Sequence, residues 1–167
     1  MKNIFVLLLA AGLVSGCGSK DKPESKFQGV TPQKDYIAEG MRYLNASNVN
    51  DAIKSFDNAI KQDPNNPINY IILGQVYMRL SQPDRAVDSF SAAVRVDPQN
   101  GEAYYLLAVC QGLKGSKKDA IISAQRSVEI FMKGRNEEKF KQAALLLRSL
   151  TESGQAQNNA GVSQAQK

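Results

Sequence analysis

The chain has 167 residues, of which 43% are hydrophobic and 22% are charged, and this balance is typical of a folded protein rather than a disordered one. It contains no histidine, so the commonest general base and the commonest metal ligand are both missing from its sequence. The formal net charge of +5 is too small to indicate nucleic-acid binding by itself.

The N-terminus has the order of parts that an export signal needs. One positive charge, Lys2, precedes an uninterrupted apolar run over 4–14, "IFVLLLAAGLV". A bilayer-spanning helix needs about 20 apolar residues, so this shorter run suits the hydrophobic region of a secretory signal instead. The next residues, "LVSGC" over 13–17, resemble the lipobox of bacterial lipoproteins. The alternative is a plain signal peptide in which Cys17 is incidental.

The lipobox resemblance implies a membrane anchor and a location. Residues 1–16 would be removed as the signal peptide, and Cys17 would become the lipidated first residue, carrying a diacylglyceryl group and an N-acyl chain such as palmitate. Gly18 follows, where an aspartate would favour retention at the inner membrane. The resemblance therefore implies a lipid-anchored protein of the bacterial cell envelope, at the outer membrane facing the periplasm where the envelope has two membranes.

A polar segment separates this cysteine from the folded part. Residues 17–31 are mixed in charge and contain Pro23, which is typical of a flexible tether. Phe27 and Val30 are its only large apolar residues after the cysteine. We expect the tether to let a folded domain over 32–152 stand away from the membrane surface.

From residue 33 onward the sequence repeats at a fixed interval. The distance from Tyr36 to Tyr70 equals the distance from Tyr70 to Tyr104, and it defines the repeat period. The recurring positions are Tyr36, Tyr70 and Tyr104; Gly40, Gly74 and Ala108; Ala52, Ala86 and Ala120; and Phe56, Phe90 and Ala124. Agreement of several positions at one period indicates a repeat architecture. Apolar residues within each repeat recur at helical spacing, so each repeat is predicted to form two helices.

These residues resemble the tetratricopeptide repeat. The second repeat carries the full pattern: Tyr70, Leu73, Gly74, Tyr77, Ala86, Phe90, Ala93 and Pro98. The first repeat has Glu39 in place of the leucine, and the third departs from the pattern after Ala120. The resemblance implies an all-α fold, a right-handed α-solenoid of three helix hairpins over about 33–66, 67–100 and 101–134. Phe56 is expected at the junction of repeats one and two, and Phe90 at that of repeats two and three.

Polar residues and prolines predict where the helices begin and end. Thr31-Pro32 and Asn66-Pro67 suit helix starts, and Asn48 and Ser116, each with an aspartate three positions later, resemble capping boxes. Asp63-Pro64 and Asp97-Pro98 predict helix ends, and Gly134 ends the last helix of repeat three.

A further helix is predicted over 136–151. Asn136 suits its cap, and Glu137 and Glu138 place negative charge in its first turn. We interpret it as the polar terminal element that a solenoid requires. The polar residues 153–167 are predicted to be a disordered tail.

No pattern in the chain indicates catalysis. We find no nucleophile with a base, no Cys-x-x-Cys and no glycine-rich phosphate loop. Cys110 is expected to be a buried, inert thiol, although an intermolecular disulfide is the alternative in an oxidising compartment. The protein is therefore predicted not to be an enzyme, and to need no cofactor and no metal.

The repeat resemblance implies a binding role for the first helix of each hairpin, which lines the concave face. The predicted partner-binding residues are Ile37, Met41, Leu44, Ile71, Gln75, Met78, Tyr105 and Val109. They form a largely apolar set, which favours a hydrophobic peptide or partner helix as the ligand. The alternative is that several of them pack between repeats or against Phe27 and Val30.

The predicted function is a membrane-anchored scaffold or adaptor that binds a protein or peptide partner in the cell envelope and assists assembly of an envelope or pilus-type complex. The alternative is an accessory subunit of an envelope enzyme, such as a peptidoglycan-processing complex. Neither nucleic acid nor a small-molecule substrate is expected. Eight basic and four acidic residues lie between 114 and 141, and they face either an anionic surface or, more simply, water.

Overall fold

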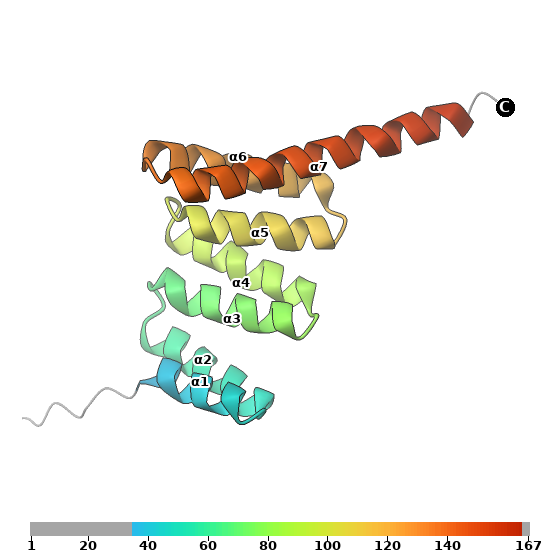
Figure 1. Ribbon diagram of the computed structural model, residues 1–167. Coiled ribbons are helices and arrows are strands. Elements are labelled where there is room, and N and C mark those ends of the chain that lie inside the picture. The colour runs from blue at the N-terminus through green and yellow to red at the C-terminus, as the bar shows by residue number, and fades with distance from the viewer. Residues whose placement is uncertain (1–34, 165–167) are drawn as a thin grey trace, which may run out of the picture. The chain divides into compact units, whose positions relative to one another are not determined.

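The computed structural model describes the backbone of residues 35–164 and the side chains up to Glu152. Its seven helices are α1 (Tyr36–Asn45), α2 (Val49–Gln62), α3 (Pro67–Arg79), α4 (Pro83–Val96), α5 (Gly101–Leu113), α6 (Lys117–Lys133) and α7 (Glu137–Gln164). Figure 1 shows α1 with α2, α3 with α4 and α5 with α6 as stacked hairpins, and α7 lies along α6. The expected all-α fold of three hairpins and a capping helix is confirmed. The predicted signal segment, Cys17 and the tether lie outside the described residues.

Asparagine side chains begin several of these helices. The side-chain oxygen of Asn66 accepts a hydrogen bond from the Ile68 N–H at 3.0 Å, and that of Asn100 accepts one from Ala103 at 3.0 Å. Each bond satisfies one of the backbone donors that a helix N-terminus leaves without a partner inside the helix. The predicted start at Asn66 is therefore confirmed.

The predicted ends of the second helices are also confirmed. Helix α2 ends at Gln62 and α4 at Val96, directly before Asp63 and Asp97. A proline follows each aspartate, and the residue before a proline is disfavoured in helical geometry, so the chain leaves the helix at that point.

Three helix boundaries differ in detail from the predictions. Helix α1 begins after Asp35, whose carboxylate accepts from the Ala38 N–H at 2.9 Å, while the predicted cap Thr31 lies outside the described residues. The capping box predicted at Ser116 is wrong, because its hydroxyl makes no capping bond and only its backbone carbonyl accepts, from Ala120 at 2.9 Å. Gly134 ends α6 as predicted, but with a φ of −75°.

The left-handed conformation that ends α6 is carried by the residue after this glycine. Arg135 has a φ of 53°, and its N–H donates to the Met132 carbonyl at 3.2 Å. Asn48, in contrast to Ser116, behaves as predicted: its amide donates to the Asp51 carboxylate at 2.6 Å and its oxygen accepts from the Asp51 N–H.

Within each of the first two hairpins, a phenylalanine ring lies directly on a glycine. A Cβ added at Gly40 would be 2.6 Å from the Phe56 ring, and one at Gly74 would be 2.7 Å from the Phe90 ring. Real Cβ contacts are not that short, so the glycine is what allows each helix pair to approach. In the third hairpin the same two positions are both alanine, Ala108 and Ala124, and both are fully buried.

Two core clusters join the hairpins. The first contains Ala52 and Phe56 from α2 with Leu73 and Val76 from α3, and the second contains Ala86 and Phe90 from α4 with Leu107 and Cys110 from α5. Phe56 and Phe90 therefore lie at the two junctions where sequence analysis placed them, and both rings are fully buried.

Helix α1 presents a polar face at the N-terminal end of the stack. Helix α3 packs on α2 through an apolar face that contains Ile72, Leu73, Val76 and Leu80. One repeat earlier, in α1, the same positions hold Ala38, Glu39, Arg42 and Ala46, which are smaller or charged. Glu39, which replaces the leucine of the repeat pattern, is half-buried, and its carboxylate accepts a hydrogen bond from the Ser55 hydroxyl of α2 at 3.4 Å.

Helix α7 covers the other end. Its Ala143 is fully buried, whereas its exposed residues up to Glu152 are Glu137, Glu138, Lys141, Gln142, Leu145, Arg148, Ser149, Thr151 and Glu152. All of these except Leu145 are polar, as a terminal element requires. The helix continues to Gln164, past the predicted boundary at 151 and into the segment predicted to be a tail, and no proline lies between 137 and 164 to end it.

Candidate functional site

The first helices of the three hairpins, α1, α3 and α5, follow one another along one side of the stack (Figure 1). We call the surface they form the first-helix surface. Two hollows lie on it, one between α1 and α3 and one between α3 and α5. The first is lined by residues of α1 and α3 alone, whereas the second is also bordered by Ser81 in the turn and by Pro83 of α4.

The first hollow, between α1 and α3, is small. It is lined by Met41, Leu44, Ile72, Gln75, Val76 and Arg79 and has a volume of about 30 Å³. That is about the space that one water molecule takes up in the liquid, so this hollow admits no more than a shallow contact.

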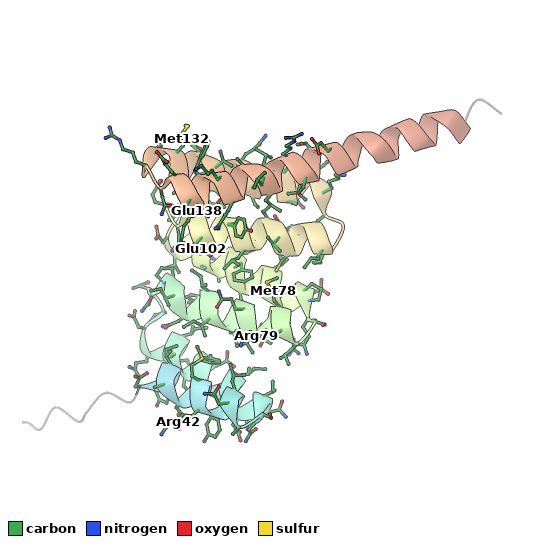
Figure 2. The ribbon with its side chains drawn as sticks, viewed as in Figure 1. Arg42, Met78, Arg79, Glu102, Met132 and Glu138 are labelled. Atoms are coloured by element: carbon green, nitrogen blue, oxygen red, sulfur yellow. The ribbon has the colours of Figure 1, made fainter. Side chains whose placement is uncertain are left out.

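The second hollow, between α3 and α5, is much larger. Its volume is about 250 Å³, and it is lined by Met78, Ser81, Pro83, Cys110 and Leu113. Figure 2 shows Met78 on the side of α3 nearer α5, and Arg79 on the side nearer α1. An apolar cavity of about 150 Å³ holds a benzene molecule, so a hollow of this size has room for a large side chain.

The two hollows occupy equivalent places in successive repeats. Three residues of the first have counterparts one repeat later in the second: Leu44 and Met78, Val76 and Cys110, Arg79 and Leu113. The repeat period of the sequence therefore places the two hollows at equivalent positions, although the first is far smaller and has Gln75 and Arg79 in its lining.

The eight residues predicted to bind a partner fall into three groups. Ile37 and Leu44 pack against the first core cluster, and Ile71 and Met78 pack against the second. Four of the eight predicted residues therefore pack between repeats, which is the alternative that sequence analysis left open for this set.

The other four predicted residues are more accessible. Met41 is 46% exposed, Gln75 is exposed, and Tyr105 and Val109 are half-buried. Four of the eight line a hollow: Met41, Leu44 and Gln75 the first, and Met78 the second.

Sequence reasoning missed several residues of the hollows. Arg79 and Leu113 were not singled out, nor were Ser81 and Pro83 in the turn before α4. Arg79 and Leu113 occupy the same position in successive repeats, and Leu113 is 71% exposed. The available sequence signal was their shared repeat position, and its meaning depended on the neighbouring helix.

Ion pairs use part of the positive charge of the C-terminal third. Four of the eight basic residues between 114 and 141 have acidic partners: Lys114 with Asp84, Lys139 with Glu102, and Arg126 and Lys133 with Glu129. The hydrogen bond that Lys114 donates to Asp84 raises the pKa of the Lys114 ammonium, and hydrogen bonds from Lys133 and Arg126 lower the pKa of the Glu129 carboxyl. These pairs lie at the surface, so each contributes little to stability.

The described part of the chain offers no cluster of three or more Cys, Asp or Glu side chains that would hold a metal ion. Over 35–164, no helix has both the length and the apolar character needed to span a membrane.

Cys110 is the one reduced cysteine of the described segment, and its side chain is fully buried in the second core cluster. Burial raises the pKa of its thiol to about 11. The thiolate is the reactive form of cysteine, so the thiol is held in its unreactive form near neutral pH.

We expect Cys110 to react slowly with iodoacetamide at pH 8. Raising the pKa from 9.0 to about 11 lowers the thiolate fraction at this pH about 100-fold. Labelling is measured by mass spectrometry in a Cys17→Ser chain, where Cys110 is the single thiol. The same chain in guanidinium chloride is the control and should label at the rate of a free cysteine. Equal rates in the folded and unfolded chains would contradict the burial of this side chain.

Comparison of the sequence with protein-family models agrees with the repeat pattern. Residues 73–134 match one model of the tetratricopeptide repeat, and residues 55–88 match another. Residues 55–134 are therefore similar to the tetratricopeptide repeat. No curated protein sequence matches it at a significant level.

Solved structures show the same fold. The TPR2B domain of yeast Sti1, in its pHsp70 complex, is 19% identical with a TM-score of 0.64 over 71% of this chain and 94% of that one. Pseudomonas aeruginosa PcrH, with the chaperone-binding region of PopD, is 19% identical with a TM-score of 0.64 over 71% and 90%. Yersinia enterocolitica SycD, with a YopD peptide, is 18% identical with a TM-score of 0.63 over 71% and 92%. The described helices thus form a tetratricopeptide-type solenoid.

Proposed function

We propose that this chain is a scaffold that holds a segment of a protein partner on its first-helix surface. The observation that carries this proposal is the large, mainly apolar hollow between α3 and α5, which has a smaller counterpart one repeat earlier. Met41 and Leu113 are large apolar side chains left exposed in the linings of these hollows.

The similar structures support this role. PcrH and SycD were each solved with a segment of another protein bound, and the Sti1 domain was solved in complex with pHsp70. Because the fold is shared, binding a peptide segment is a reasonable use of the same surface here. The apolar lining of the hollows favours an apolar segment over a charged one.

We further propose that Cys17 carries a lipid anchor and that the scaffold acts in the cell envelope, at the outer membrane facing the periplasm. The support is the order of the N-terminal parts, with one basic residue, the apolar run over 4–14, "LVSGC" and then Gly18. In this setting the scaffold assists assembly of an envelope or pilus-type complex. An accessory role beside a peptidoglycan-processing enzyme is the second proposal, and the identity of the partner decides between them.

Site-specific photo-crosslinking in cells tests the partner surface. We place a photoreactive amino acid at Met41 or at Gln75, which are exposed on the first-helix surface, and at Asp88 or Arg95, which are exposed on α4. Adducts with a protein partner are expected at the first pair of positions and not at the second. Exposed positions are chosen because buried charges or bulky groups in the core would unfold the domain and imitate a loss of binding.

Adducts that form at Asp88 and Arg95 but not at Met41 and Gln75 would show that the partner binds the second helices, and the first-helix proposal would fail. Mass spectrometry of the adducts identifies the partner. A pilus or envelope assembly component supports the first role, and a cell-wall enzyme supports the second.

A further inference from the structure

The two core clusters match each other almost residue for residue. Each member of the first cluster and of its half-buried surroundings can be compared with the residue at the same position of the next repeat. The matching apolar pairs are Ala52 and Ala86, Phe56 and Phe90, Leu73 and Leu107, Val76 and Cys110, Ile37 and Ile71, Tyr43 and Tyr77, Leu44 and Met78, Ile53 and Val87, Ile60 and Val94, and Ile72 and Leu106. The same packing is therefore built twice.

Two positions break this correspondence, and both become polar. Tyr77 and Leu80 pack against the first cluster, whereas the residues one repeat later are Gln111 and Lys114. Their side chains bind polar partners instead. The Gln111 oxygen accepts a hydrogen bond from the Ser123 hydroxyl at 2.7 Å, and Lys114 Nζ lies 2.5 Å from Asp84 Oδ1.

The large hollow lies at this second junction. Its wall includes Met78 and Cys110, which belong to the second cluster and its surroundings. At the first junction, where Leu80 is present, the equivalent hollow has only about 30 Å³, against about 250 Å³ at the second. The loss of two apolar side chains from the repeated packing, at Gln111 and Lys114, thus coincides with the larger hollow.

The next junction along the stack shows that the chain fills such a space with leucine. Leu150 of α7 contacts α5 so closely that a Cβ added at Gly112 would be 3.1 Å from its Cδ2 atom. Gly112 occupies the position of Met78 in the next repeat. Leu80 therefore packs at the first junction and Leu150 at the third, whereas at the middle junction the position equivalent to Leu80 is Lys114.

We propose that the second hollow is a specificity pocket for one branched aliphatic side chain, leucine or isoleucine, of the segment that binds the first-helix surface. This inference rests on the proposed scaffold function. The pocket takes from the partner the side chain that the repeat itself lacks at Lys114. Met78 and the 71%-exposed Leu113 form apolar walls from α3 and α5, so an entering side chain contacts both repeats.

Small amides of single amino acids test the pocket without a known partner. N-acetyl-leucine methylamide is titrated into the full chain, and the NMR signal of the Met78 methyl group is followed. We expect saturable shifts and binding at least fivefold tighter than that of N-acetyl-alanine methylamide. Equal binding of the two amides, or no shift at Met78, would overturn the proposal.

Two variants distinguish binding in the pocket from nonspecific hydrophobic binding elsewhere on the protein. Lys114→Leu supplies the missing leucine, so it should raise the melting temperature and weaken binding of the leucine amide at least tenfold. Leu113→Ser alters only an exposed side chain of the pocket wall and should weaken binding of the leucine amide at least threefold. Lys118→Leu, on an exposed position of α6, is the matched control and should change neither. Unchanged amide binding in both Lys114→Leu and Leu113→Ser would refute the pocket.

The chain's own Phe27 or Val30 is the competing occupant. If Phe27→Ala or Val30→Ala strengthens amide binding at least threefold, the pocket is filled from within and the partner assignment is wrong. The titration and the photo-crosslinking fail independently. Amide binding without a crosslinked partner would support the pocket and contradict the scaffold function. A crosslinked partner without amide binding would support the scaffold function and contradict the pocket.

Discussion

Replacing Phe90 with alanine is expected to lower the free energy of unfolding by about 3–5 kcal/mol, because its ring is fully buried at the junction of repeats two and three. Small domains are stable by only about 5–15 kcal/mol in total, so this loss should abolish much of the cooperative melting transition. Chemical denaturation of wild type and variant, followed by circular dichroism, measures it.

A second substitution makes this prediction more specific to the structure. In the wild type, Gly74→Ala should destabilise, because the added Cβ would be 2.7 Å from the Phe90 ring. In the Phe90→Ala background the same methyl group enters vacated space and favours the helix, where alanine is better than glycine by about 1 kcal/mol. We therefore expect Gly74→Ala to change sign between the two backgrounds.

The third repeat is the natural precedent for this double variant, because it already has the Ala108 and Ala124 pair. An equal effect of Gly74→Ala in both backgrounds would show that the ring does not lie on the glycine. The matched control is Gly115→Ala, where a left-handed φ of 78° and not a neighbouring side chain opposes alanine. Its cost should be the same with and without Phe90.

Sequence analysis placed Phe90 at the junction of repeats two and three, and the structure adds its contact with Gly74. A glycine and a phenylalanine that recur together in successive repeats are linked by sterics, so the position of one constrains the other. Helix ends at Asp63 and Asp97 are predicted equally well, because the proline that follows acts through local backbone geometry. Features that depend on only a few neighbouring residues are visible without the fold.

The large hollow is not visible in the same way. The hollow exists because no side chain fills the space between α3, α4 and α5. No single residue type in a sequence indicates an unfilled volume. The signal was present as Lys114 in place of the Leu80 of the previous repeat. Its meaning needed the structure, which shows Lys114 bonded to Asp84 instead of packed. The length of α7 was missed because residues 153–164 have neither a helical apolar pattern nor a proline.

Substitution of Cys17 by serine is expected to move the protein almost completely from the membrane to the soluble fraction. Each buried methylene of an acyl chain contributes about 0.8 kcal/mol, and one chain alone binds only marginally. A diacylglyceryl group with an N-acyl chain supplies several such chains, which hold a protein on the membrane almost permanently. Cell fractionation and mass spectrometry of the N-terminal peptide measure the effect.

Salt and a second cysteine variant distinguish lipid anchoring from other causes. Membrane attachment through the basic residues between 114 and 141 would weaken in high salt, because exposed charges are screened beyond about 10 Å at 0.1 M. Attachment through acyl chains would not. Cys110→Ala should stay on the membrane at all salt concentrations, because its thiol is buried. A Cys17→Ser chain that remains on the membrane after a high-salt wash, or an unmodified thiol at Cys17, would show that "LVSGC" is not a lipidation motif and that the scaffold reaches its partner without an anchor.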